Sequence, residues 1–600
     1  MSAPAGDSRA AAPPWYAPVR MRRSWVRLLH LLRATIRASE LVLAIIAAGV
    51  GAASGLAAVG VSSLAHVLQR LFYGIAADER LSTIPAIAPS ALPYLPLGGL
   101  VVGLITWAWM RRYPQPVVDP VEANALRGGR MSIRDSLFVA VQSVISNGSG
   151  ASVGLEAAYA QVGGAIASLT GLALKLRRSD LRTFVGAGAG AGIAAAFGAP
   201  LTGAFYAFEI IIGTYTTANI APVVAAALAG ALVSRLLGND TLIFHTQVAD
   251  ILSVSHYVMF ALMGLICAFA GIGVMRLVAW VDFAVSRLPG PKWMRPGLGG
   301  VILATLAWYV PETLSAGHGA MHFDFAAELG MTTLLTLLLA KTAASVIALG
   351  FGFRGGLFFA SLYLGSLLGR LCVVALYAGG VNVGIDPLAG ALVGMGAMAV
   401  AIIGGPFTMT FLVLETTGDF GLSAATLTAS IVASLVVRET FGYSFSTWRL
   451  HLRGETIRSA HDVGWLRYLT AGRMMRAGAP AVAAATPIKE FREQFPLGSA
   501  RRAVVVDEDG RYAGIVGVSA AHAAAEEDGP VGGLATLRHY SLTPEMAIKE
   551  IMGAFDASAG DELAVLDSEG RPLGVLTEAH ATRRYAEELE MARRDLTGGD

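Results

Sequence analysis

Charged residues are scarce in this sequence, and their scarcity excludes a fully soluble protein. Of the 600 residues only 15% are Asp, Glu, Lys or Arg, and 54% are apolar, whereas soluble chains carry about 25% charged residues. Six stretches without any charge exceed the roughly 20 residues that cross a bilayer as a helix. They cover residues 41–69, 81–110, 183–208, 210–234, 252–275 and 387–414. The composition therefore predicts an α-helical polytopic protein embedded in a lipid bilayer.

Cysteine is nearly absent as well. Cys267 and Cys372 each lie in an apolar stretch, which excludes a disulfide framework and a cysteine-based metal site. The sequence shows neither a nucleophile–base pair nor a cluster of metal ligands, so we expect no enzyme, no cofactor and no metal. The formal net charge is only +2, and we expect no nucleic-acid partner.

An Arg-rich segment, residues 1–38, precedes the first apolar stretch. The positive-inside rule places this segment in the cytoplasm. The basic part and the apolar stretch after it are both too long for a cleaved signal peptide. We expect a multi-pass protein of the cell inner membrane with both termini in the cytoplasm. The arginines are Arg20, Arg22, Arg23, Arg27, Arg33 and Arg37.

The membrane part, residues 39–458, contains two homologous halves at about 39–238 and 252–447. "GAPLTGAFYAFE", which begins at Gly198, recurs as "GGPFTMTFLVLE" at Gly404, 206 residues later. "GLEAAYAQVG" and "GLFFASLYLG" align in the same way. Repeated segments with helices interrupted by Gly and Pro point to a transport site at the interface of the repeats. The matched pairs are Pro200 and Pro406, Thr202 and Thr408, Phe205 and Phe411, and Glu209 and Glu415.

A hydrophilic tail, residues 459–600, carries a second repeat. "AVVVDEDGRYAGIVGVSAAH" and "LAVLDSEGRPLGVLTEAH" align with an offset of 60 residues. Each half predicts a strand, an Asp-x-x-Gly hairpin turn, a second strand and a helix. The tail is therefore expected to be a small cytoplasmic α/β domain with modules at about 471–524 and 529–588.

Glu156 is the one charged residue between Asp135 and Lys175. An isolated ionisable residue inside a membrane domain is a functional-site hypothesis by default. The alternative is an ordinary acid in the first turn of a helix, where it is favourable by about 0.3–1 kcal/mol. "GLEAA" and "GGLFFAS" both predict helix N-termini, whose unpaired N–H groups and partial positive charge attract an anion.

Five segments together resemble the CLC family of chloride channels and proton–chloride antiporters over about residues 39–455. They are "GASVGLEAAYAQVGG", "GAGAGAGIAAAFGAPLTGAFYAFE", "FRGGLFFASLYLGSLLG", "GMGAMAVAIIGGPFTMTFLVLETTGDF" and "FGYSFSTWRLHLRG". The tail resembles a pair of CBS modules. The resemblance implies an inverted-repeat architecture with interrupted helices, a homodimer, and transport of chloride or a similar small anion.

The resemblance also implies roles for individual residues. Glu156 would be a gating glutamate that occupies an ion site as a tethered anion and swings away when protonated, giving voltage-gated chloride channel-type activity. The hydroxyl of Tyr443 would face the central anion. The full set of expected anion-binding positions is Gly154, Leu155, Gly356, Leu357, Phe358, Phe359, Tyr443 and Val117.

The sequence departs from the family pattern at several of these positions. Val117 stands where an anion-coordinating serine is expected, with Asp119 close by, and Leu155 replaces an arginine. Ile210 stands where antiporters of the family carry an inward-facing glutamate. Its apolar side chain cannot relay a proton, so we favour passive conduction and interpret Glu209 and Glu415 as a structural pair.

The tail departs from its family in the same way. Nucleotide-binding CBS modules carry Ser or Thr followed three residues later by Asp, whereas here Thr577 is followed by His580, and Gly517 by Ala520. Nucleotide binding is therefore doubtful, and a packing or dimer-stabilising role is favoured. Two alternatives remain for the whole protein: a proton-coupled chloride antiporter, and a non-conducting membrane sensor that signals through the tail.

Overall fold

The computed structural model describes residues 39–238, 253–453, 469–525, 528–558 and 560–597. The chain divides into two compact units, residues 1–462 and 463–600. The expected N-terminal segment 1–38 and the expected domain boundary at 458/459 lie outside the described residues, as do residues 239–252 between the two halves.

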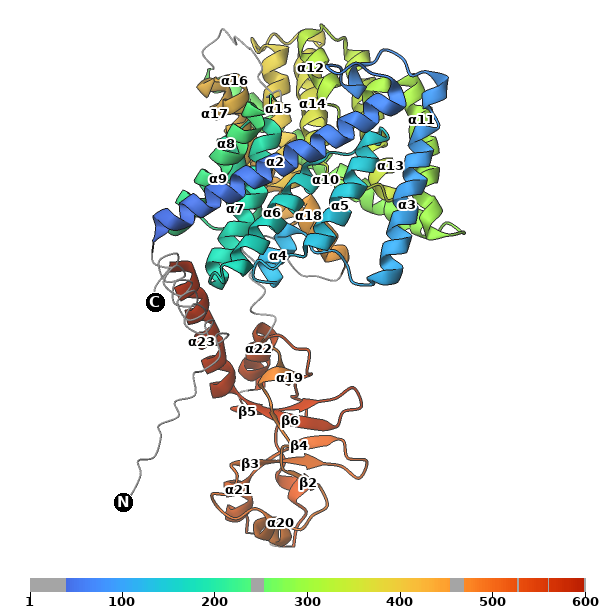
Figure 1. The fold of residues 1–600 in the computed structure, drawn as a ribbon. Coiled ribbons are helices and arrows are strands. Elements are labelled where there is room, and N and C mark those ends of the chain that lie inside the picture. Colours follow the sequence, from blue (N-terminus) through green and yellow to red (C-terminus); the bar gives the residue numbers. More distant parts are fainter. Residues whose placement is uncertain (1–38, 239–252, 454–468, 526–527, 559, 598–600) are drawn as a thin grey trace, which may run out of the picture. The chain divides into compact units, whose positions relative to one another are not determined.

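The first unit is helical throughout its described part (Figure 1). Seven of its described helices are long and apolar enough to cross a membrane. The first half comprises α2 (Glu40–Tyr73), α3 (Tyr94–Arg112), α4 (Pro120–Leu126), α5 (Ile133–Gly148), α6 (Glu156–Ala173), α7 (Arg178–Phe197), α8 (Pro200–Tyr206), a π-helical turn (Ala207–Ile212) and α9 (Thr217–Leu236). The second comprises α10 (Val254–Ser286), α11 (Arg295–Tyr309), α12 (His318–Ala326), α13 (Met331–Gly350), α14 (Phe358–Ala378), α15 (Pro387–Ile403), α16 (Pro406–Thr417), α17 (Phe420–Thr440) and α18 (Phe445–Leu452).

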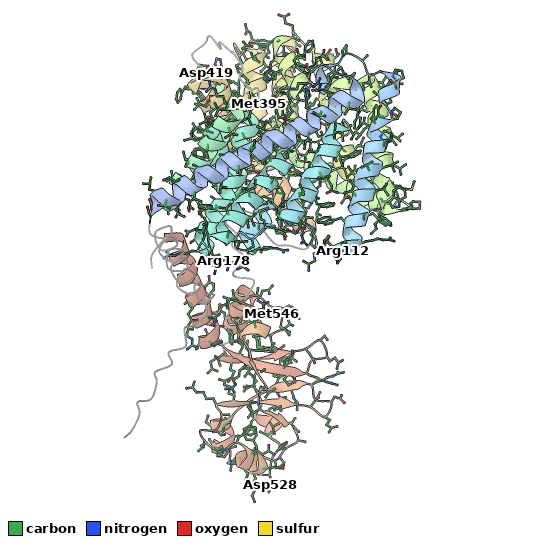
Figure 2. The ribbon with its side chains drawn as sticks, viewed as in Figure 1. Arg112, Arg178, Met395, Asp419, Asp528 and Met546 are labelled. Atoms are coloured by element: carbon green, nitrogen blue, oxygen red, sulfur yellow. The ribbon has the colours of Figure 1, made fainter. Side chains whose placement is uncertain are left out.

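The surface of this unit suits a bilayer. Large apolar side chains point outward along the long helices, among them Leu71 of α2 (71% exposed) and Trp280 of α10 (66% exposed). In Figure 2, Arg112 and Arg178 lie at one end of the unit and Asp419 at the opposite end. Charges at the helix ends and apolar side chains between them are what a membrane-spanning bundle requires.

The packing repeats between the two halves. α6 packs on α7 as α14 packs on α15, α7 packs on α9 as α15 packs on α17, and α2 packs on α9 as α10 packs on α17. Several elements are too short to span a bilayer, and α4, α8 and α16 each begin at a proline. The expected α-helical architecture of two repeats with interrupted helices is confirmed.

Glu209 and Glu415 join the halves by capping each other's helix. The Glu209 carboxylate accepts hydrogen bonds from the N–H of Phe407 (3.1 Å) and from the N–H and hydroxyl of Thr408 (2.8 and 2.6 Å) at the start of α16. Glu415 accepts the matching bonds from Leu201 (2.7 Å) and Thr202 (2.8 and 2.7 Å) at the start of α8. The prediction of a structural pair is confirmed.

Removing either cap should lower stability. Glu209→Ala and Glu415→Ala each remove a carboxylate that satisfies two N–H groups at a helix start, and lost N-caps cost about 0.5–2 kcal/mol. We expect both variants to unfold at a lower midpoint temperature in detergent. Size-exclusion chromatography of heated samples measures this temperature. Glu439→Ala is the matched control, because the Glu439 side chain is 77% exposed and lies 4.0 Å from that of Arg438, which is itself 69% exposed. An unchanged midpoint in both cap variants would contradict the structural role.

The second unit contains two three-stranded sheets, one of β1 (Arg476–Ala477), β6 (Pro572–Thr577) and β5 (Glu562–Leu566), the other of β2 (Ala481–Ala483), β3 (Arg502–Val506) and β4 (Tyr512–Gly517). Its helices are α19 (Ala471–Met474), α20 (Ile488–Gln494), α21 (Val518–Ala523), α22 (Ile548–Ser558) and α23 (Glu578–Thr597).

Both predicted hairpins of the tail are present. Oδ1 of Asp507 accepts from the N–H groups two and four residues later, at 3.0 and 2.8 Å, and Asp567 does the same at 2.9 and 2.8 Å. Gly510 and Gly570 supply the positive φ that each turn needs (76° and 80°). The strand, turn, strand and helix order expected of each repeat is confirmed.

Candidate functional site

The site lies where the first residues of α6 and α14 meet. Gly154 and Gly356 form an isolated antiparallel bridge: the N–H of Gly154 donates to the carbonyl of Gly356 (2.9 Å), and the reverse bond is 3.1 Å. Leu155 and Leu357 follow as the N-caps of the two helices. The bridge thus brings together two segments that are about 200 residues apart in the sequence.

This bridge corrects part of the expected anion site. Because the N–H groups of Gly154 and Gly356 are bonded to each other's carbonyls, they are not free to donate to an anion. The backbone donors that remain here are the N–H groups in the first turns of α6 and α14, which have no partner within their own helix. The small size of Gly154 matters instead, because a Cβ atom there would overlap the Glu156 carboxylate.

The Glu156 carboxylate folds back onto the N-terminus of its own helix. Glu156 is only 4% exposed. The backbone N–H groups of Glu156 itself and of Phe359, at the start of α14, face the carboxylate. A Cβ atom added to Gly154 would lie 1.9 Å from its Oε2, whereas one added to Gly356 would lie 3.5 Å away. The carboxylate therefore occupies the position where the two helix starts favour an anion.

One oxygen of this carboxylate has no partner. Oε2 of Glu156 is buried and accepts no hydrogen bond within the described part of the chain. An unpaired buried carboxylate oxygen is costly, so this position is held less firmly than a fully bonded one. The arrangement suits a side chain that can move away from the helix starts.

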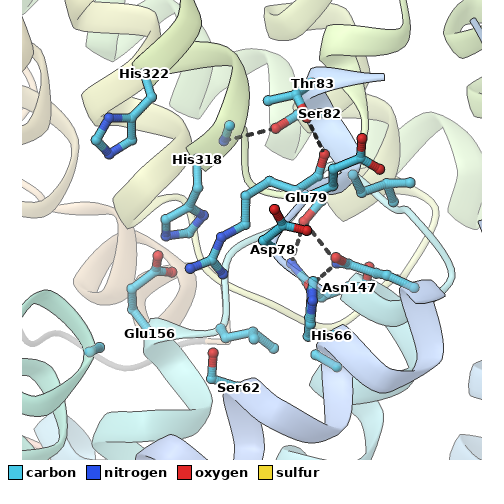
Figure 3. Close-up of a pocket in the computed structure, with 18 of the residues that line it drawn as sticks. Ser62, His66, Asp78, Glu79, Ser82, Thr83, Asn147, Glu156, His318 and His322 are labelled. Atoms are coloured by element: carbon cyan, nitrogen blue, oxygen red, sulfur yellow. Dashed lines mark hydrogen bonds between the residues drawn. The ribbon is translucent and has the colours of Figure 1, made fainter. Parts of the chain in front are cut away.

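Glu156 lines two cavities. The first, which we call the histidine cavity, has a volume of about 780 Å³ and is lined by His66, His318 and His322 among others (Figure 3). The second, which we call the arginine cavity, has a volume of about 410 Å³ and is lined by Arg354, Arg449 and Arg453 among others. Among the described residues, Glu156 is the one that lines both.

Among the described residues, the arginine cavity is lined by three arginines and three acids. Asp119 and Asp282 are its acids besides Glu156, and Arg453 also approaches Glu122 at 3.8 Å. Asp119 has a structural task, because it caps α4 by accepting from the N–H of Glu122 at 2.8 Å. With Glu156 set aside, the three arginines outnumber the two aspartates, and an excess of cations in a cleft raises the local concentration of anions. The acid that the sequence placed near the filter is therefore a helix cap in the wall of the arginine cavity.

Most of the other predicted positions line one of the two cavities. Leu155 lines the histidine cavity. Val117, Gly356, Leu357 and Phe358 line the arginine cavity, and so does Ile210. Phe359 is fully buried, and its ring stacks on that of His318 with centroids 3.4 Å apart. Whether these residues bind an anion stays a prediction.

Tyr443 is placed differently from the expectation. Its hydroxyl lies 3.2 Å from Nδ1 of His451. Its side chain lines a separate cavity with Glu209 and Ile210 and does not line the arginine cavity. The aromatic hydroxyl in the wall of the arginine cavity belongs to Tyr206, at the end of α8. Its ring centroid is 6.1 Å from that of Phe358.

The sequence analysis missed Lys341 in the middle of α13. Lys341 is 1% exposed, and its Nζ donates to the carbonyls of Thr313 (3.1 Å) and Ser315 (2.7 Å). The Ser315 hydroxyl in turn accepts from Asn147 at 3.0 Å in the wall of the histidine cavity. The signal was present, because Lys341 is a lone charge in an apolar stretch, as Glu156 is.

Known proteins are similar in sequence and in fold to the first unit. A family model described as "Voltage gated chloride channel" matches residues 98–438. The chain is 29% identical over 402 residues to a putative chloride channel protein ClcB-like of Ralstonia nicotianae (66% of this chain, 93% of that protein). It is 29% identical over 396 residues to the voltage-gated ClC-type chloride channel ClcB of Salmonella dublin (64% and 93%).

Solved structures show the same fold at lower identity. A slow cyanobacterial Cl⁻/H⁺ antiporter superposes with a TM-score of 0.60 at 23% identity, over 68% of this chain and 97% of that one. A CLC-type fluoride/proton antiporter gives 0.56 at 20% identity, over 66% and 96%. A eukaryotic CLC transporter gives 0.56 at 19% identity, over 92% and 98%.

Proposed function

Because the chain belongs to the voltage gated chloride channel family, we propose that it moves a small anion, chloride first of all, across the membrane between the arginine cavity and the histidine cavity. The observation that carries the proposal is the position of Glu156. Its carboxylate lies between the two cavities, on the helix starts that favour an anion.

Glu156 would act as the gate. While its carboxylate is charged and lies on the helix starts, it occupies the position that a permeant anion needs. Protonation neutralises the carboxylate and weakens its attraction to the helix starts, so the side chain can leave and an anion can enter. Since the permeant anion carries charge through the membrane field, transport should depend on voltage.

The conduction is proposed to be passive, as in a channel. Ile210 lines the arginine cavity at the position where a proton-relaying acid would be expected, and its side chain can carry no proton. Proton-coupled anion exchange is the second candidate. It is favoured by the likeness to solved antiporters and by a glutamate that faces two cavities and can exchange a proton with either.

The wider organisation is part of the same proposal. We expect a homodimer in the inner membrane with one pathway in each subunit, and cytoplasmic termini. The tail would be a CBS-like pair that stabilises the dimer. Thr577 supports a structural role, because its hydroxyl accepts from the N–H of His580 (3.3 Å) at the start of α23. A nucleotide is not an expected ligand.

Ion flux from liposomes that contain the purified full chain tests the proposal. We expect chloride to leave down its gradient, with nitrate and bromide following, while the external pH recorded at the same time stays constant. We expect a constant pH because Ile210, which cannot carry a proton, stands where a proton-relaying acid would be needed.

Uphill proton movement in fixed ratio to chloride would replace the channel by the antiporter. Absence of flux for every anion would favour the non-conducting sensor. Empty liposomes from the same preparation give the background leak.

A further inference from the structure

The arginine cavity contains few neutral hydrogen-bond donors. Among the described residues that line it, only Tyr206 and Ser446 carry hydroxyl groups. Much of the remaining wall is apolar, as at Val117 and Phe358, and the Gln161 amide already donates to the carbonyl of Val118 at 2.8 Å. An anion that sheds water on entering this part needs donors in exchange, because burying a charge without hydrogen bonds is costly.

The Tyr206 hydroxyl is placed to be such a donor. Tyr206 is half-buried in the cavity wall, and its hydroxyl is close enough to feel the charges of both Asp119 and Glu156. Tyr206 makes a ring contact with Phe358, but its hydroxyl forms no hydrogen bond within the described part of the chain. A hydroxyl that has no partner in the described part of the chain and belongs to a residue lining a cavity is suited to a ligand that accepts hydrogen bonds.

The two residues that the sequence analysis offered for this task, Val117 and Tyr443, are excluded by chemistry and by position. Val117 has no donor. The Tyr443 hydroxyl is bonded to His451 and lies at another cavity. The repeat offers no structural need for a tyrosine either, because the position that matches Tyr206 in the second half is Leu412.

We propose that the Tyr206 hydroxyl donates a hydrogen bond to the anion in the arginine cavity and thereby sets the preference for small, strongly hydrated anions. The proposal rests on the proposed anion transport and names its specificity-determining residue. A neutral donor compensates the lost water without the strong trapping that an arginine would cause. Small anions lose more hydration energy than large ones, so they depend most on this hydroxyl.

Tyr206→Phe in the full chain tests the assignment. The substitution removes the hydroxyl and keeps the ring that contacts Phe358, so the protein should fold normally. Hydrogen bonds to charged groups contribute about 1.5–3 kcal/mol, so chloride affinity in calorimetry of the detergent-solubilised protein should fall about tenfold or more. In liposomes the ratio of chloride to nitrate flux should fall as well.

Two further variants make the outcome decisive. Val117→Thr in the Tyr206→Phe background keeps the shape of the side chain and returns a hydroxyl to the same cavity, so it should restore part of the chloride affinity. Tyr443→Phe should leave affinity and flux ratio as in the wild type.

If Tyr443→Phe lowers chloride affinity and Tyr206→Phe does not, the assignment of Tyr206 is overturned while anion transport stands. If the wild-type chain neither binds chloride nor moves any anion, the proposed function fails and the inference fails with it. Those two results differ in the behaviour of the wild type, so they cannot be confused.

Discussion

Anion flux through Glu156→Gln and Glu156→Ala should no longer respond to external pH, and any proton coupling should disappear. In the wild type we expect flux to rise as the pH falls, because protonation removes the charge that holds the side chain over the helix starts. Both substitutions remove that charge at every pH. Protein yield should change little, because a first-turn acid contributes about 0.3–1 kcal/mol. Flux from liposomes over a range of external pH measures the effect.

Asp135→Asn is the matched control for this experiment. Asp135 is also an acid in the first turn of a helix, α5, but it lines neither the arginine cavity nor the histidine cavity. Its variant should keep the pH dependence of the wild type. If both Glu156 variants keep it too, Glu156 is an ordinary helix-end acid and the gating proposal is wrong.

Gly154→Ala should displace the Glu156 carboxylate while residue 156 itself stays unchanged. The added Cβ would lie 1.9 Å from Oε2 of Glu156 and 2.7 Å from its Cδ, far inside van der Waals contact. The carboxylate is the free end of a flexible side chain, so it should give way. We expect flux that is as insensitive to pH as in Glu156→Ala, and no further change when the two substitutions are combined.

Gly356→Ala provides the control on the other side of the bridge. A Cβ at this position would meet Oε2 of Glu156 at 3.5 Å, which is ordinary contact. This variant should stay close to the wild type. A Gly154→Ala protein with wild-type pH dependence would show that the carboxylate does not sit over Gly154. Loss of flux that Glu156→Ala does not relieve would place the new methyl group itself in the path.

Local patterns were sufficient to predict much of this protein. Uncharged stretches predicted the membrane helices, and the 206-residue offset predicted two halves that the packing confirms. The Asp-x-x-Gly repeats predicted both hairpins of the tail. Glycines before "LEAA" and "LFFAS" predicted helix starts, and α6 and α14 begin at Glu156 and Phe358. Each of these features depends on residues that are close in sequence, or on the repetition of a segment.

Asp119 shows a local signal that the sequence analysis did not use. An Asp followed by Pro and, three residues on, by Glu is typical of a helix start. The sequence "DPVE" has this form, and Asp119 caps α4. Asp119 therefore has both a place in the wall of the arginine cavity and a capping role that its local sequence predicts.

The site itself was decided by contacts across the two halves. Only the tertiary structure shows that Gly154 and Gly356 use up each other's N–H groups, and that Glu156 alone among the described residues lines both cavities. It also shows that Tyr206 lines the arginine cavity, whereas the Tyr443 hydroxyl lies against His451. The physical reason is distance along the chain. Sequence periodicity and capping fix where a helix begins, but packing between elements about 200 residues apart fixes which way its side chains and free N–H groups point.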